Sequence, residues 1–346
     1  MLAGGKAGRF QTLHQPIWQD KALALLDDKP LLVWVVENVA DIVDEVVVCV
    51  DTEERKGRYR EILEKYRLSV KVVVDEKTEI NGPNVAILSG LNVAQTDFCM
   101  VIPCDMPFVK PEVINYLFEI AEEFDVVVPI WPNGVLETLI MVLKRTMGLE
   151  IVRTLCQLKR TRPIDIPRAA AKTLLVSPLK TINKLDPTLK SFININTQED
   201  LTKLQTRKLQ GAIQQDITLI RGSFLISDLQ LMYDAIKIYQ KGNFLVAKEK
   251  IDLCQRRFES CGNFFWAALA SESKGKVLLK QHQQLQKNEN TSNQQAVFAF
   301  DFEYKNVFSN AVNNYHKEAE LYKTNHCTRL LERAITDKQN TLTFIT

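Results

Sequence analysis

Four short stretches of the chain carry residue types that suit phosphate and metal chemistry. The first, residues 2–9 (LAGGKAGR), is rich in glycine and contains two cations. Glycine lets a backbone approach a phosphate closely and point its N–H groups at it, while Lys6 and Arg9 can neutralise phosphate charge. Taken alone, this stretch is equally consistent with a surface turn of small residues.

The second stretch is the pair Asp20 and Lys21, which follows the glycine-rich segment after a short insert. A lysine held beside a bound phosphate stabilises the negative charge that develops on a phosphoryl group in the transition state. An isolated Asp-Lys pair is more often solvated surface charge. Its place just after a predicted phosphate-binding loop makes Lys21 a catalytic candidate.

The third stretch, residues 103–107 (PCDMP), directly follows the apolar run 98–102. Asp105 is therefore predicted at the carboxyl end of a buried strand, which is where open α/β sheets bind ligands. Carboxylates are preferred Mg²⁺ ligands, and the flanking prolines restrict the backbone that carries this one. We predict that Asp105 binds Mg²⁺; the alternative is a turn or helix cap.

The fourth stretch, residues 192–201 (FININTQEDL), alternates apolar and amide residues before a predicted helix start. On a strand, Asn194 and Asn196 share one face, and two adjacent amides can hydrogen-bond a polar heterocycle. An edge strand that runs into a helix cap is an equally good interpretation.

A sheet must position these residues, and the chain up to about residue 205 has the pattern of one. Short β-branched runs predict strands at 45–50, 70–74, 98–102 and 125–130. Helix-like apolar spacing separates them at 30–41, 55–66, 84–94 and 111–124. This alternation predicts a doubly wound, mostly parallel α/β sheet of Rossmann-like type, with ligands beyond the carboxyl ends of the strands.

The remainder of the chain has helical spacing. Helices are predicted at 228–241, 245–259, 263–284 and 296–335, the last as one long or two shorter helices, and a polar loop at 286–295. We therefore divide the chain into an α/β domain at 1–205 and an all-helical domain at 206–346. The predicted helical hairpin around Gly242 faintly resembles a tetratricopeptide hairpin. The sequence, however, shows no repeat at a fixed period. The aromatic patch at 264–266 is interpreted as core.

Composition excludes several classes of protein. With 46% hydrophobic and 25% charged residues, the chain has the composition of a globular protein. Its formal net charge of +2 does not indicate nucleic-acid binding. No apolar run suggests a membrane span or signal peptide. Seven cysteines without a CxxC pair predict reduced thiols and a cytoplasmic location. The four histidines are scattered, which argues against His-based nucleophilic catalysis.

In their order along the chain, these stretches resemble the molybdenum cofactor guanylyltransferases, within the wider nucleotidyltransferases that begin with a Leu-Ala-Gly-Gly loop. The resemblance covers about residues 2–205. It rests on the glycine-rich loop, on the PCDMP and NINTQEDL stretches, and on three shorter matches: Asp20-Lys21, Lys29-Pro30-Leu31, and Asp75 ahead of Gly82-Pro83.

The resemblance implies an enzyme that uses Mg²⁺ to transfer GMP from GTP to the phosphate of molybdopterin and releases pyrophosphate. It implies NTP binding by Leu2, Ala3, Gly4, Gly5, Lys6, Arg9 and Lys21. It also implies that Arg9, Lys21 and Asp105 are catalytic. It further assigns nucleotide contacts to Asp75, Gly82 and Asp105, Mg²⁺ to Asp105, and the pterin acceptor to Asn194 and Asn196. A phosphate monoester is mostly ionised at pH 7, so no general base is required.

Three features depart from the family pattern. The chain starts inside the glycine-rich loop, so we expect either a truncated start, with about five to seven apolar residues encoded upstream, or a sheet without its central strand. Residues 11–19 lengthen the path to Lys21. The family's second glycine after Gly82-Pro83 is replaced, since Asn84 and two apolar residues follow.

Alternatives remain open at this point. A cytidylyltransferase of the same cofactor fits the residues, as does a guanylyltransferase of another phosphorylated acceptor, such as adenosylcobinamide phosphate. A catalytically inactive nucleotide-binding scaffold fits the missing strand and the helical extension, but it leaves Lys21, Asp75 and Asp105 together unexplained. The helical region is expected to bind a protein partner or to self-associate.

Overall fold

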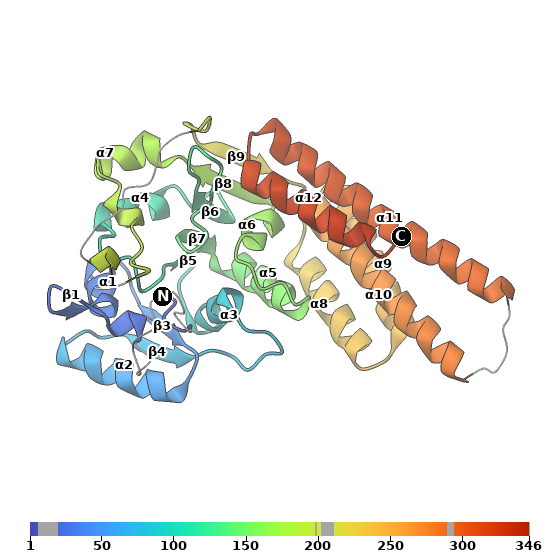
Figure 1. The fold of residues 1–346 in the computed structure, drawn as a ribbon, viewed down its shortest axis with the longest axis horizontal. Helices are drawn as coiled ribbons and strands as arrows, with labels where there is room; N and C mark the ends of the chain where they lie inside the picture. The colour runs from blue at the N-terminus through green and yellow to red at the C-terminus, as the bar shows by residue number, and fades with distance from the viewer. Residues whose placement is uncertain (6–19, 198, 202–210, 289–293, 346) are drawn as a thin grey trace.

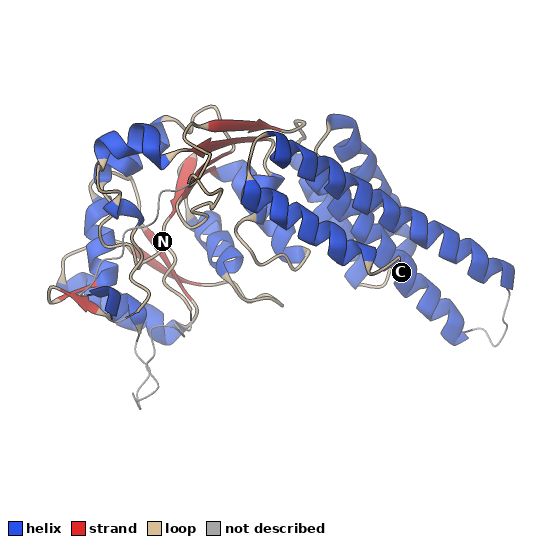
Figure 2. Ribbon diagram, turned by 45° about the horizontal axis from the view of Figure 1, so that its top comes forward, coloured by secondary structure: helices blue, strands red, loops and turns tan. Residues whose placement is uncertain are grey.

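The computed structural model describes residues 1–5, 20–197, 199–201, 211–288 and 294–345. An α/β part with helices around a twisted sheet lies beside a region of long helices (Figure 1). Figure 2 shows the strands confined to the first of these parts. Thus the described residues form the predicted fold class, an α/β unit followed by helices.

The α/β part contains two sheets joined by the start of the chain. The smaller sheet pairs β3 (Val47–Val50) with β4 (Lys71–Val74) in parallel. The larger has the order β5 (Phe98–Val101), β7 (Met141–Lys144), β6 (Val126–Pro129), β8 (Lys172–Val176), β9 (Ile217–Ile220). β6 and β8 are parallel, whereas β7 and β9 run antiparallel to their neighbours. All four predicted strands are present.

Residues 1–3 act as a short central strand. Leu2 forms parallel bridges to both Cys49 of β3 and Pro103 after β5. Its N–H donates to the Ile102 carbonyl at 2.8 Å, and the Ala3 N–H donates to the Cys49 carbonyl at 2.9 Å. The sheet is therefore continuous through these residues. A cavity of about 620 Å³ lies next to Met1 and Leu2, and residues at the amino ends of β3 and β5 line it.

Helices connect the strands and begin where the sequence provides starts. Pro83 and Pro111 occupy the first turns of α3 and α4, and Thr52 caps α2 by accepting the Arg55 N–H. The helices of this part are α1 (Leu31–Ala40), α2 (Glu53–Lys65), α3 (Pro83–Val93), α4 (Pro111–Glu119), α5 (Arg145–Gln157), α6 (Asp165–Ala169) and α7 (Asn183–Leu185).

Short elements carry the loops around the predicted site. A hairpin of β1 (Leu25–Leu26) and β2 (Lys29–Pro30) follows the single turn η2 (Lys21–Leu23). Further along lie η3 (Pro178–Ile182), η4 (Lys190–Phe192) and η5 (Glu199–Leu201). Residues 193–196 lie outside any strand, so the predicted strand carrying Asn194 and Asn196 is wrong. This segment instead hydrogen-bonds to a loop, because the Ile195 N–H donates to the Asp105 carbonyl at 2.9 Å.

The helical region has five helices among its described residues. They are α8 (Ile226–Gln240), α9 (Phe244–Cys261), α10 (Phe264–Asn288), α11 (Gln294–Thr324) and α12 (Thr328–Leu342). Gly242, at φ 84°, turns the chain between α8 and α9, and Asn243 caps α9. Long helices of this region extend away from the sheet (Figure 1). No helix in the described part of the chain is long and apolar enough to cross a membrane.

The helical region shares its core with the α/β part. Phe265 and Trp266 are fully buried, as predicted for the aromatic patch, and the Trp266 indole N–H donates to the Ala169 carbonyl of α6 at 2.8 Å. Leu229 of α8 and Leu155 of α5 belong to one apolar cluster. β9, which lies beyond residue 205, completes an edge of the larger sheet. The division between residues 205 and 206 stays a prediction.

Candidate active site

The glycine-rich start of the chain lies against the carboxyl end of β3. A Cβ atom on Gly4 would lie 3.0 Å from the Asp51 backbone nitrogen, so only glycine fits there without a shift. Gly5 has a φ of 138°, which also favours glycine. Ala3 is buried and Leu2 partly buried in the sheet. Lys6 and Arg9 lie outside the described residues.

A buried hydrogen-bond network anchors Asp20, the residue before the candidate lysine. The hydroxyl of fully buried Tyr59 donates to the two Asp20 carboxylate oxygens at 2.8 and 2.9 Å. Burial, the largest cause, and the nearby negative charges raise the pKa of Tyr59, so the hydroxyl remains a donor. Asp20 also caps η2 by accepting the Ala22 N–H. These contacts fix the backbone from which Lys21 projects.

Arg55 on α2 ties three parts of the site together. Its guanidinium lies 3.3 Å from Asp20, contacts Asp51 at 2.7 Å and donates to the Gly5 carbonyl at 3.1 Å. Arg55 thus places a positive charge beside the glycine-rich loop. Arg55, Tyr59 and Asp51 were not predicted from the sequence. Asp51 follows a predicted strand just as Asp105 does, and that signal could have identified it.

Lys21 and Asp105 converge as predicted. The Lys21 ammonium forms an ion pair with Asp105 and donates to the Asn196 amide oxygen at 3.0 Å. Both charged side chains are largely buried, with 15% and 16% of their surfaces exposed. The backbone bond between Ile195 and Asp105 holds the segment that carries Asn194 and Asn196 beside the Asp105 loop. One ammonium, one carboxylate and an amide therefore meet at the carboxyl end of β5.

Two buried side-chain oxygens, one on Asp105 and one on Asn194, are of the types that bind magnesium. Asp105 Oδ1 and Asn194 Oδ1 are buried and accept no hydrogen bond from the described residues. Carboxylate and amide oxygens are suitable Mg²⁺ ligands, and Mg²⁺ commonly completes its shell with water and substrate phosphates. The described residues contain no cluster of three or more His, Cys, Asp or Glu side chains suited to a metal. A site that shares its ion with a phosphorylated substrate agrees with both observations.

Asp75 and Gly82 lie on the other side of β3, after β4. Burial, and secondarily the negative charge of Asp51, raise the pKa of Asp75 to about 6. Its Oδ1 is buried and accepts no hydrogen bond within the described part of the chain. Gly82 precedes α3 with a φ of 137°. The carboxyl ends of β3, β4 and β5 thus carry Asp51, Asp75 and Asp105 along one edge.

Comparison with known proteins gives matches over the α/β part. The profile of the MobA-like NTP transferase domain matches residues 1–168. A probable molybdenum cofactor guanylyltransferase from Methanosarcina mazei is 30% identical over 204 residues, which cover 59% of this chain and 88% of the relative. The corresponding protein from Methanosarcina acetivorans is 31% identical over 206 residues, with the same coverage.

Among solved structures, similarity is found to molybdopterin-guanine dinucleotide biosynthesis protein A from Archaeoglobus fulgidus. That chain has 23% sequence identity and a TM-score of 0.48, with 58% of the present chain and 93% of the other covered. The long helices from α8 onwards lie beyond the matched profile.

Proposed function

Because the chain belongs to the family of MobA-like NTP transferases, we propose that it transfers GMP from GTP to the phosphate of molybdopterin and releases pyrophosphate. It is a nucleotidyltransferase, as the resemblance implied. GTP and a phosphorylated pterin are then its substrates. Both assignments are based on the names of the relatives, which are probable molybdenum cofactor guanylyltransferases.

The observation that carries the catalytic proposal is the meeting of Lys21, Asp105 and Asn196. A nucleotidyl transfer needs positive charge around the α-phosphate and a fixed place for the acceptor. The ammonium of Lys21 supplies charge, and the glycine-rich backbone before it can approach the phosphates. A scaffold without activity has no need of a largely buried ammonium beside a carboxylate, since such pairs are costly to desolvate.

In the proposed reaction, an oxygen of the acceptor phosphate attacks the α-phosphorus of GTP. The bond from that phosphorus to the oxygen bridging the α- and β-phosphates breaks, and pyrophosphate leaves with the electron pair. Because the attacking phosphate is already ionised, no side chain has to remove a proton. Lys21 stabilises the charge that accumulates on the transferred phosphoryl group. Asp105 would hold Mg²⁺, which would neutralise charge on the phosphates.

The acceptor and base contacts extend the same proposal. Asn196, next to Lys21, and Asn194 offer amide groups to a pterin ring. Asp75 offers a carboxylate that can accept from the adjacent N–H groups of guanine. Cytosine presents only a single amino donor on its pairing edge, so a carboxylate at this place favours guanine. Gly82, at the start of α3, would contact the nucleotide through its backbone.

The test is a reaction of the purified protein with each NTP in turn, Mg²⁺ and molybdopterin. We expect pyrophosphate release with GTP and a guanine dinucleotide product identified by mass. Product with CTP alone would indicate a cytidylyltransferase. Product only with another phosphorylated acceptor would show that this acceptor, and not molybdopterin, is the substrate. Failure to bind any NTP in calorimetry would favour the non-catalytic scaffold.

A further inference from the structure

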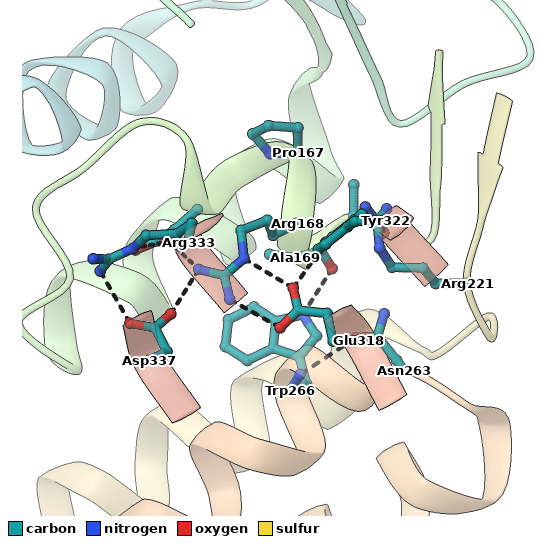
Figure 3. Close-up of polar contacts among 12 residues, drawn as sticks. Pro167, Arg168, Ala169, Arg221, Asn263, Trp266, Glu318, Tyr322, Arg333 and Asp337 are labelled. Atoms are coloured by element: carbon teal, nitrogen blue, oxygen red, sulfur yellow. Dashed lines mark hydrogen bonds and ion pairs between the residues drawn. The ribbon is translucent and has the colours of Figure 1, made fainter. Parts of the chain in front are cut away.

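A buried charge cluster joins the α/β part to the helical region. Its centre is Arg168 of α6, which is fully buried. The Arg168 guanidinium donates twice to Glu318 of α11, both at 2.8 Å, and contacts Asp337 of α12 at 2.7 Å (Figure 3). Asp165 of the same short helix accepts a further bond at 2.8 Å.

These charges are locked in place by their burial. Burial by itself would raise the pKa of Asp337, but the guanidiniums of Arg168 and Arg160 hold it below its usual value. The carboxylate therefore remains charged and must keep its partners, because an unpaired buried charge is strongly destabilising. The cluster fixes α12, at Asp337, relative to the chain segment that carries Arg160.

Arg160 extends this cluster toward the nucleotide side of the molecule. Its guanidinium donates to Asp337 at 2.6 Å and to Asp165 at 2.9 Å. Its backbone carbonyl accepts the side-chain amide of Asn84 at 2.8 Å. Asn84 is fully buried in the first turn of α3. The side chain of Arg160 thus binds the helical region, while its backbone binds α3.

The same segment packs against Gly82. A Cβ atom on Gly82 would lie 3.5 Å from the Thr161 carbonyl oxygen, so Thr161 lies beside the start of α3. A second, longer bond runs from Asn84 to the Arg162 carbonyl at 3.5 Å. Direct contacts therefore lead from Asp337 through Arg160 to Asn84, two residues after Gly82.

We propose that Asp337 and Arg160 are positioning residues for nucleotide binding: α12 holds the 160–162 segment, and this segment holds the first turn of α3 beside the nucleotide. The proposal rests on the proposed function for the role of Gly82. In this proposal the helical region helps to position the NTP-binding residues of its own chain. The side-chain amide of Asn84 supplies the contact with the 160–162 segment.

Asp337→Asn tests the proposal, with Glu318→Gln as the matched control. Both changes neutralise a buried carboxylate that pairs with Arg168, but only Asp337 contacts Arg160. We expect Asp337→Asn to raise the KM for GTP about tenfold with kcat within about twofold, because misplacement of a binding element acts on binding. Glu318→Gln should lower thermal stability while leaving this KM unchanged. Asp337→Glu, which keeps the carboxylate, should recover much of the affinity.

Hydrogen–deuterium exchange separates this proposal from the proposed function. In the nucleotide-free protein, Asp337→Asn should increase exchange of the backbone amides of residues 84–87, and Glu318→Gln should not. Equal increases in both variants, or none in either, would overturn the positioning role. If the wild-type protein turned over no GTP, the proposed function would fail, and the exchange result would still decide the role of Asp337.

Discussion

At Lys21, one ammonium contacts a carboxylate and an amide that come from segments far apart in the chain. Asp105 lies 84 positions away and Asn196 lies 175 positions away. Asp20, fixed by Tyr59 and Arg55, limits how far the ammonium can move. Because Lys21 is restrained and largely desolvated, its charge acts on a bound phosphate more strongly than a mobile surface lysine would.

Replacing Lys21 therefore tests catalysis directly. We expect Lys21→Ala to lower kcat by about 10²- to 10³-fold, the range found when one preorganised charge or donor is removed. Lys56→Ala is the control, since Lys56 pairs with Glu53 on the exposed surface of α2. Steady-state pyrophosphate release measures both variants. A Lys21→Ala protein that kept wild-type kcat would remove Lys21 from the mechanism.

Asp75 gives nucleotide binding a pH dependence. The pKa of Asp75 is raised to about 6, so the carboxyl group loses its proton as the pH rises through that value. If the carboxylate accepts from guanine, the Kd for GTP should rise about tenfold for each pH unit below 6. Its raised pKa also means that folding stability contributed by the protonated form is lost as the pH rises from about 4 to 6.

Calorimetry at pH 5, 6 and 7 measures this effect, with Asp75→Asn as the comparison. The terminal phosphate of GTP titrates in the same range, so only the part of the pH dependence that Asp75→Asn abolishes belongs to Asp75. Identical profiles for the two proteins would exclude a contact between the carboxylate and the base.

At the scale of elements, the cavity between β3 and β5 offers a test of the sheet. Burial lowers the pKa of the Met1 amino group, which donates to the Val47 carbonyl at 2.7 Å at the rim of this cavity. Four β-branched residues added before Met1 should pair with both strands and raise the free energy of unfolding by about 2 kcal/mol, as cavity filling does. Four alternating Gly and Ser residues are the control. Equal melting temperatures would mean that the added strand does not enter the sheet.

Elements with a local signal could be predicted from the sequence. The β-branched run before Asp105 identified β5 and put its carboxylate at the correct sheet edge. The alternation at 193–196 was misleading, because the segment pairs with no neighbouring strand and bonds instead to the Asp105 loop and to Lys21. Pairings such as Arg168 with Glu318, 150 positions apart, leave no local pattern, so the buried charge cluster could not be predicted.

At the scale of the whole molecule, the helical region completes the α/β part. Trp266 covers α6, Glu318 and Asp337 neutralise Arg168, and β9 pairs with β8. A region that only docked another protein would not need to supply buried partners to its neighbour. Partner binding or self-association of this region stays a prediction. Only the outer faces of its helices could take part, because the inner faces pack against the α/β part.

A chain that ends at residue 210 should therefore fail to fold cooperatively. It lacks β9 and leaves Arg168 with only Asp165 of its three carboxylate partners. Losing partners of a buried charge costs about 3–5 kcal/mol, and exposing apolar surface that Trp266 covers adds a similar amount. Together these approach the whole stability of a typical domain, about 5–15 kcal/mol. Thermal unfolding followed by circular dichroism measures the result. A sharp transition near the wild-type temperature would instead identify residues 1–205 as an independent domain.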